Sequence, residues 1–195
     1  MVALRKPVPT RMTVAEFLAW NPGDPTGARW QLIDGEPVAM APASRNHGGL
    51  MMEVGRLLSN HLADKRSVCQ LIGQPGISPR VRAEWNFRIP NLGITCTPPS
   101  NDLMVPDPVL LIEILSPSNE AETRSNIWAY TTIPSVREIL AIDSTKIEAE
   151  LLVRGTDGNW PASPVILTAG DTLTLPGIGF STRLEAFYRT TALGV

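Results

Sequence analysis

The strongest hydrophobic periodicity of the chain lies between Ser44 and Leu62, where apolar residues recur at intervals of three and four. These intervals place the apolar side chains on one face of an amphipathic helix. A shorter helix is expected over 13–20, because Thr13 with Glu16 three positions later forms the reciprocal capping pattern of helix starts. The stretch 21–23, Asn-Pro-Gly, should end that helix.

Alternating and apolar segments elsewhere predict strands. Asp34-Gly35 between two such runs, over 29–40, is a strong β-hairpin signal. Further segments are rich in Val, Ile, Leu, Trp and Phe and are bounded by Pro or Gly, which is typical of strands. They cover residues 67–72, 82–88, 93–97, 109–115, 135–143, 146–153 and 164–167.

Two more helices complete the expected fold. One should run from Ser118 to Pro134, between the strands 109–115 and 135–143, and this order of elements is typical of a crossover unit. A short terminal helix is expected over Ser181–Tyr188. The pattern therefore predicts the α/β class, with a mixed sheet flanked by helices and an N-terminal hairpin.

Composition predicts one globular domain over 1–195. The chain has 195 residues, of which 43% are hydrophobic and 18% charged, enough for one core and too few to require two. Its net charge of -2 gives no overall basic footprint, so a nucleic-acid partner would need a local cationic patch or a divalent metal. Four aromatic residues are expected in the core rather than as base-stacking platforms, namely Trp85, Phe87, Trp128 and Tyr130.

The two cysteines, Cys69 and Cys96, lie in strand-like runs without CxxC spacing. We expect buried free thiols in a reducing compartment rather than a disulfide or a metal site. The first twelve residues carry no apolar stretch long enough for a signal peptide, and no apolar run is long enough to span a bilayer. These features favour a cytoplasmic protein with no membrane partner.

Glu113 is the residue that folding alone explains least. It is the one acid in the apolar run 109–115, and burying an ionised carboxylate costs several kcal/mol unless it is paired or coordinated. A metal ion would supply a partner. An ion pair with Arg124 or Arg88, or a solvent-exposed strand edge, would also satisfy the charge, and the pattern alone does not separate these alternatives.

A metal-dependent phosphodiesterase presents oxygen ligands from neighbouring strands. Asn91 and Glu113 have a suitable separation for two adjacent strands joined by a long loop. Asp107, in the literal Pro-Asp pair 106–107, is too close to Glu113 for two strands and a turn to fit between them. We therefore expect Asp107 to end the loop before the strand.

Several segments together resemble a known family. The chain is similar to the Uma-two type of bacterial restriction endonucleases, which belongs to the PD-(D/E)XK nuclease superfamily. The resemblance runs in consistent order from about residue 12 to about residue 160. The segments that carry it are 30–36 (WQLIDGE), 41–47 (APASRNH), 88–93 (RIPNLG), 111–118 (LIEILSPS), 128–130 (WAY) and 134–138 (PSVRE).

The resemblance implies a restriction-endonuclease-like fold and a set of site residues. In the family, a metal-binding acid follows a proline after an Arg-Ile-like strand, and the matching residue of this chain is Asn91. The family's second acid matches Glu113. The family's lysine lies four positions before a tyrosine that matches Tyr130, so its position in this chain is Asn126. A further glutamate of the family matches Gln31. Three of the four expected charged positions are therefore amides. Losing a carboxylate and a lysine weakens a hard-cation site and removes the group that stabilises the developing phosphorane charge.

Two further residues are candidates for auxiliary roles. Arg124 lies two positions before Asn126, so it could replace the lysine only if the helix is rotated or the side chain reaches around it. His47, where the family also tends to carry His, could contact a phosphate or a water near the metal. Alternatively, His47 is only a helix-entry residue that bonds to the backbone.

Two functions follow from these residues. The first is a DNA endonuclease of the PD-(D/E)XK type with a degenerate site, in which Glu113 and Asn91 hold Mg²⁺ or Mn²⁺ weakly or not at all. The second is a catalytically inactive relative that serves as a nucleic-acid-binding or protein-interaction module, as the amides at 31, 91 and 126 suggest. A homodimer is expected by analogy alone.

Overall fold

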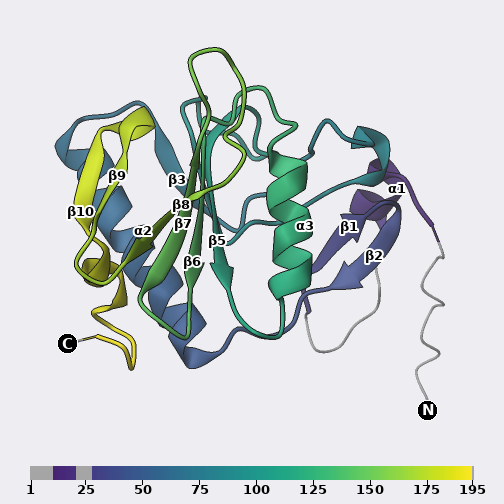
Figure 1. Cartoon of the computed structure of the whole chain (residues 1–195). Coiled ribbons are helices and arrows are strands. Elements are labelled where there is room, and N and C mark those ends of the chain that lie inside the picture. Colours follow the sequence, from purple (N-terminus) through teal and green to yellow (C-terminus); the bar gives the residue numbers. More distant parts are fainter. Residues whose placement is uncertain (1–10, 21–27, 195) are drawn as a thin grey trace.

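The computed structural model describes residues 11–20 and 28–194. A six-stranded sheet in the order β3-β4-β5-β6-β7-β8 forms its centre (Figure 1). All neighbouring strands pair antiparallel except β5 and β6, which are parallel and are connected through α3 (Glu120–Tyr130). The mixed α/β fold and the crossover are thus as predicted. The strands are β3 (Gln70–Gly73), β4 (Leu92–Thr95), β5 (Pro108–Leu115), β6 (Glu138–Asp143), β7 (Glu148–Val153) and β8 (Val165–Thr168).

Two small hairpins and two helices surround this sheet. The N-terminal hairpin pairs β1 (Trp30–Ile33) with β2 (Glu36–Ala39) around Asp34-Gly35, as expected. A second hairpin pairs β9 (Thr172–Leu175) with β10 (Phe180–Arg183). The helices are α1 (Val14–Ala19), which carries the predicted capping box, and α2 (Arg45–Asp64). Three 3-10 turns lie at Ala83–Trp85, Pro176–Ile178 and Leu184–Tyr188.

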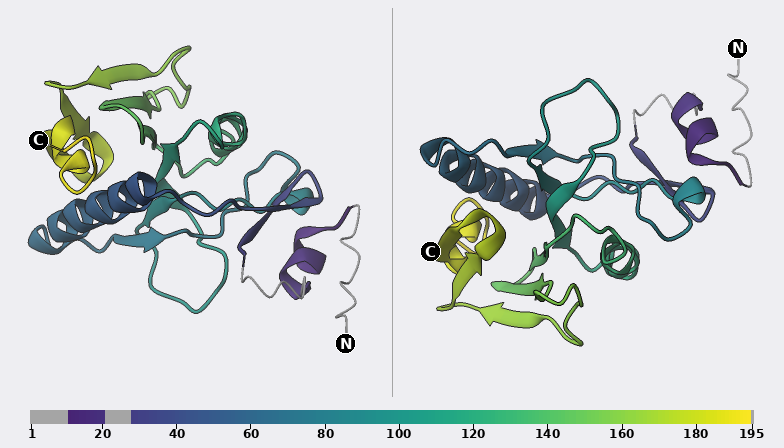
Figure 2. Two further views of the ribbon diagram at one scale, coloured as in Figure 1. Left: turned by 90° about the horizontal axis from the view of Figure 1, so that it is seen from below. Right: turned by 90° about the horizontal axis from the view of Figure 1, so that it is seen from above.

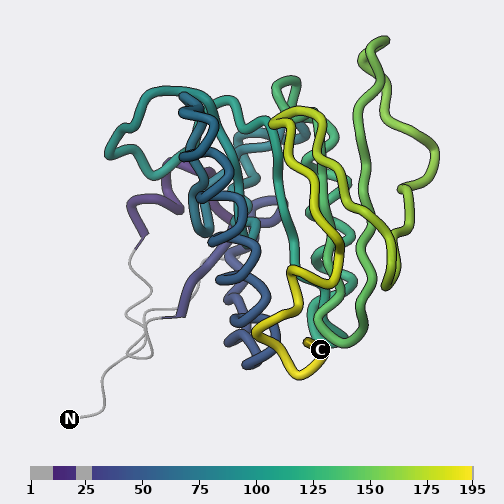
Figure 3. The backbone as a smooth tube through the Cα atoms, turned by 90° about the vertical axis from the view of Figure 1, so that its left-hand side faces the viewer, coloured from purple at the N-terminus to yellow at the C-terminus, as the bar shows by residue number. Residues whose placement is uncertain are grey.

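The helices cover opposite faces of the sheet. α2 and the C-terminal hairpin pack on one face and α3 on the other, as the end-on views and the side view show (Figures 2 and 3). Strand β5 explains the layering, because its side chains alternate between the faces. Leu110, Ile112 and Ile114 join the core under α2, and Leu111 packs with Tyr130 of α3. Glu113 consequently lies on the α3 face.

Two predicted elements are wrong. The segment 82–88 is not a strand: Ala83–Trp85 forms a 3-10 turn, and only Phe87 and Arg88 make isolated bridges. Arg82 has a φ of 45°, a left-handed conformation that interrupts an extended chain. The predicted terminal helix over 181–188 is a strand, β10, followed by a 3-10 turn, and its partner β9 was not anticipated.

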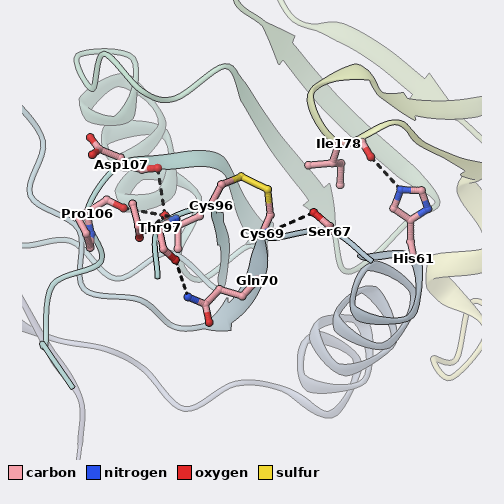
Figure 4. The surroundings of a disulfide bond; sticks show 10 residues. His61, Ser67, Cys69, Gln70, Cys96, Thr97, Pro106, Asp107 and Ile178 are labelled. Carbon is pink, nitrogen blue, oxygen red and sulfur yellow. Dashed lines mark hydrogen bonds between the residues drawn. A yellow bond between two sulfur atoms is a disulfide. The ribbon is translucent and has the colours of Figure 1, made fainter. Parts of the chain in front are cut away.

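The expectation of free thiols is also wrong, because Cys69 and Cys96 form a disulfide (Figure 4). Gln70 pairs with Thr95 in the antiparallel β3–β4 ladder, so the next facing positions are the two cysteines. Neither is buried as expected: Cys69 is half-buried and Cys96 exposed. Gln70 Nε2 donates to the carbonyl oxygen of Thr97 at 3.1 Å beside the disulfide.

Three of the expected core aromatics are at least partly covered. Tyr130 and Phe87 are buried and Trp85 is half-buried, whereas Trp128 is 62% exposed and contradicts the prediction. Within the described residues, no helix has the length and apolar character needed to cross a bilayer.

Candidate active site

A cavity of about 1160 Å³ opens beside the ends of β4 and β5 and the first turns of α2 and α3. It gathers residues that are far apart in sequence. Four of the residues singled out from the sequence line it, namely His47, Asn91, Glu113 and Asn126. Serine and threonine side chains from 116–118, 123 and 144–145 contribute hydroxyl groups to the wall.

Glu113 is held by donors from α3. Tyr130 donates its hydroxyl to Oε1 of Glu113 at 2.8 Å, and Nδ2 of Asn126 reaches the same oxygen at 3.3 Å. Asn126 and Tyr130 are four residues apart on the helix and therefore lie on one side of it. Oε2 of Glu113 has no side-chain donor among the described residues.

Burial dominates the electrostatics of Glu113. Removal from water raises its pKa to about 7, against the opposing effects of Tyr130, Asn126 and the backbone N–H of Asn91. Desolvation favours the neutral form of a carboxyl group. Neither Arg88 nor Arg124 forms an ion pair with Glu113 in the described part of the chain. The carboxyl group of Glu113 is therefore not neutralised by an ion pair with Arg88 or Arg124, which was one of the alternatives from the sequence.

Asn91 lies opposite Glu113 at the start of β4. The register pairs Leu92 with Ile112, so the preceding residue faces Glu113, as the sequence separation suggested. Oδ1 of Asn91 accepts the backbone N–H of Ile114 at 2.7 Å. Its Nδ2 lies 2.9 Å from Nε2 of His47. The oxygen of this amide is thus turned to the sheet and its nitrogen to the histidine.

His47 lies in the first turn of α2 and also lines the cavity. Its backbone N–H donates to Oγ of Ser44, the N-cap of α2, at 3.2 Å. Its ring points into the cavity and meets Asn91. Burial lowers the pKa of His47, which favours the neutral imidazole.

Asn126 is oriented by an arginine. Nη1 of Arg88 donates to Oδ1 of Asn126 at 2.7 Å, which leaves the amide nitrogen for Glu113. Arg88 lies behind Asn126 and is not part of the cavity wall. The sequence pointed to Asn126 through the family resemblance but assigned Arg88 only as a partner of Glu113.

Gln31 and Glu122 form a second polar pair beside the site. Nε2 of Gln31, on β1, donates to Oε1 of Glu122, and Oε1 of Gln31 is buried without a partner among the described residues. Glu122 lines the cavity, and its pKa is raised chiefly by burial. Sequence reasoning missed Glu122 because its position in the first turn of a helix is also typical of an ordinary surface acid.

Arg124 does not replace the missing lysine. It binds Glu150 on β7 and lies 3.6 Å from Glu120, on the side of α3 away from Glu113. The two-residue offset from Asn126 corresponds to a rotation of about 200° around the helix, so the side chains diverge.

The residues as placed do not fit a divalent metal ion. Mg²⁺ takes oxygen ligands, whereas Asn91 turns its nitrogen toward His47 and Asn126 turns its nitrogen toward Glu113. Both amide oxygens are already engaged, by Ile114 and by Arg88. In the described ranges, no cluster of three or more His, Cys, Asp or Glu residues could hold a metal. Glu113 is thus the one expected ligand whose oxygen faces the cavity.

Comparison with known proteins identifies the family. The model of the Uma2 family, described as "Putative restriction endonuclease", matches residues 14–186. The chain belongs to the Uma2 family. The resemblance noted in the sequence is thereby confirmed, and it extends beyond the segments that first indicated it.

One protein similar in sequence and one solved structure similar in fold accompany this match. An uncharacterized protein of Synechocystis is 29% identical over 184 residues, which are 92% of this chain and 92% of that protein. The crystal structure of a "putative nuclease" from Anabaena variabilis superposes with a TM-score of 0.74, covers 91% of this chain and 97% of the other, and shares 13% identity. That likeness shows a nuclease-like fold for this member of the Uma2 family.

Proposed function

We propose that this Uma2 protein binds DNA through the cavity around Glu113 and that its active site is degenerate. In this proposal, Mg²⁺ or Mn²⁺ is held weakly or not at all, and phosphodiester hydrolysis is correspondingly weak or absent. Membership of a restriction-endonuclease family supports DNA as the partner. The cytoplasmic location, the homodimer and the single domain over 1–195 stay predictions from the sequence.

The orientation of Asn91 carries the proposal. An aspartate at this position could accept the N–H of Ile114 with one oxygen and offer the other to a cation. Asn91 accepts the same N–H with Oδ1 and offers an NH₂ group, which is a donor and cannot ligate a metal. This one change removes both a charge and a ligand oxygen from the site.

A metal titration with matched variants tests the proposal. Calorimetry with MnCl₂ should detect no millimolar-affinity site in the wild-type protein, and plasmid should remain uncut in Mg²⁺ or Mn²⁺. Asn91→Asp should gain measurable Mn²⁺ binding, and Asn91→Asp combined with Asn126→Lys should gain cleavage. Asn91→Leu is the matched control, since it cannot bind metal. Efficient cleavage by the wild-type protein would overturn the degenerate-site proposal.

One observation favours a second function, that of a protein-interaction module. Among the described residues, the cavity wall contains two glutamates, Glu113 and Glu122, and one arginine, Arg29. Phosphate backbones are bound chiefly by Lys and Arg, so this balance is poor for DNA without a cation. Fluorescence anisotropy with labelled duplex and single-stranded DNA at low salt separates the two: no binding by a folded protein would favour the second function.

A further inference from the structure

Arg88 is a buried cation without a direct acidic partner. It is 3% exposed, and no carboxylate lies within ion-pair distance of it in the described part of the chain. Desolvation lowers its pKa, although arginine stays protonated in proteins. An unpaired buried charge is costly, so the amides that bind this guanidinium must compensate for the lost water.

Two asparagines hold the guanidinium in one orientation. Nε and Nη2 of Arg88 donate to Oδ1 of Asn86 at 3.2 and 2.9 Å, and Nη1 donates to Oδ1 of Asn126 at 2.7 Å. Asn86 in turn makes two hydrogen bonds with Asp34. Its Oδ1 accepts from the backbone N–H of Asp34 at 3.0 Å, and its Nδ2 donates to Oδ1 of Asp34 at 3.0 Å. Arg88 is therefore part of a continuous chain of hydrogen bonds from Asp34 to Glu113.

This arrangement decides which end of the Asn126 amide faces Glu113. Because Oδ1 of Asn126 accepts from Arg88, Nδ2 must point the other way, to Oε1 of Glu113. Amide nitrogens donate only, so the arginine converts Asn126 into a donor to the carboxylate. The charges of Glu122 and Glu113 also raise the pKa of Arg88, against the larger effect of burial.

We infer that Arg88 is the positioning residue of this site: its guanidinium orients Asn126 toward Glu113 and places a fixed positive charge behind this amide. The inference rests on the proposed function in that the cavity around Glu113 is taken as the working site. It places a cation on the segment before β4, behind the amide that occupies the position of the family's lysine on α3.

Several groups besides Arg88 face Glu113 and must be included in any test. Tyr130 and Asn126 donate to it from α3, and Glu122 on the same helix opposes its ionisation. Asn91 contributes its backbone N–H from the start of β4, and His47 of α2 contacts the Asn91 side chain. All of these residues remain unchanged when Arg88 alone is varied.

The test is a titration of the Glu113 carboxyl group by ¹³C NMR in DNA-free protein labelled at the glutamate side chains. Glu113→Gln assigns the resonance. Three substitutions separate charge from orientation: Arg88→Lys keeps the charge, Arg88→Gln keeps a donor for Asn126 without the charge, and Arg88→Met keeps neither. The expected titration midpoints rise from the wild-type protein and Arg88→Lys, through Arg88→Gln, to Arg88→Met.

Arg124→Met is the matched control, because it removes an arginine of the same region that binds Glu150 instead, and it should leave the midpoint of Glu113 unchanged. If Arg88→Met does not fold, the comparison of Arg88→Lys with Arg88→Gln decides. Equal midpoints in these two folded variants would overturn the inference. Because no DNA is present, absence of DNA binding would sink the proposed function and leave this measurement standing.

Discussion

Nδ2 of Asn91 lies 2.9 Å from Nε2 of His47, where the start of β4 meets the first turn of α2. The pair joins an amide and a neutral imidazole, and burial lowers the pKa of His47. The contact makes the histidine a reporter of whatever occupies position 91.

Asn91→Asp should raise the pKa of His47. A carboxylate beside Nε2 favours the imidazolium, which offsets the desolvation that now favours the neutral ring. NMR titration of the two histidines measures this change. The second imidazole belongs to His61, whose Nε2 lies 2.9 Å from the carbonyl oxygen of Ile178 and not beside Asn91. An unshifted His47 midpoint would mean that the new carboxylate does not face the ring.

Glu113→Gln should change the pH dependence of stability. The folded-state pKa of Glu113 is raised to about 7 from an ordinary value of 4.5, so folding favours its neutral form. The contribution of the neutral Glu113 carboxyl group to the free energy of unfolding is fully present below pH 4.5 and is lost as pH rises through 7. The loss amounts to roughly 3–4 kcal/mol, since each pH unit between 4.5 and about 7 corresponds to about 1.4 kcal/mol.

The glutamine variant does not ionise, so its stability relative to the wild-type protein should increase between pH 5 and pH 8. Its Oε1 can still accept from Tyr130 and Asn126. Urea unfolding at the two pH values measures the difference. A constant difference across this range would contradict the raised pKa.

Asn126→Lys should destabilise the protein when Arg88 is present. The ammonium group would replace the oxygen that now accepts from Nη1 of Arg88 at 2.7 Å, and two cations would meet in a buried place. We expect a loss of about 1–3 kcal/mol, in the range of buried unpaired charges. Arg88→Met in the same protein should recover much of it. A double-mutant cycle by urea unfolding measures the coupling, and additive effects would argue against direct contact.

Local sequence patterns were sufficient to predict the elements whose side-chain spacing follows a regular period. The period of α2 and the apolar run of β5 predicted both elements, because their side-chain spacing directly reflects helix and strand geometry. The same pattern singled out Glu113 as an acid in a buried strand. The positions of Asn91 and Asn126 came from the family resemblance, and the structure brings both to one cavity.

The remaining site residues depend on relationships that no local pattern carries. Arg88 follows a left-handed turn at Arg82, so its segment does not alternate like a strand and its inward direction was not apparent. Glu122 reaches the cavity because α3 begins at its rim. The pairing of Cys69 with Cys96 follows from the register of β3 and β4, which is set by long-range packing.

Removal of the disulfide should lower stability. The bond closes a loop of 27 residues, and the chain-entropy relation gives about 3.5 kcal/mol for a loop of this length. We expect Cys69→Ser combined with Cys96→Ser to lose roughly this amount in urea unfolding. A reducing agent should destabilise the wild-type protein and leave the double variant unaffected. Equal stability of the two proteins under oxidising conditions would show that the thiols are not joined in solution.

The chain of hydrogen bonds through Arg88 begins at Asp34, in the turn of the N-terminal hairpin. This turn does not line the cavity. The side chain of Asp34 is about half exposed to solvent and forms an ion pair with Arg82. A library of random variants selected for altered chemistry at Glu113 should therefore yield changes at the hairpin as well as in the cavity wall. Substitutions in this surface turn should then change the titration of the buried carboxyl group without altering any residue of the cavity wall.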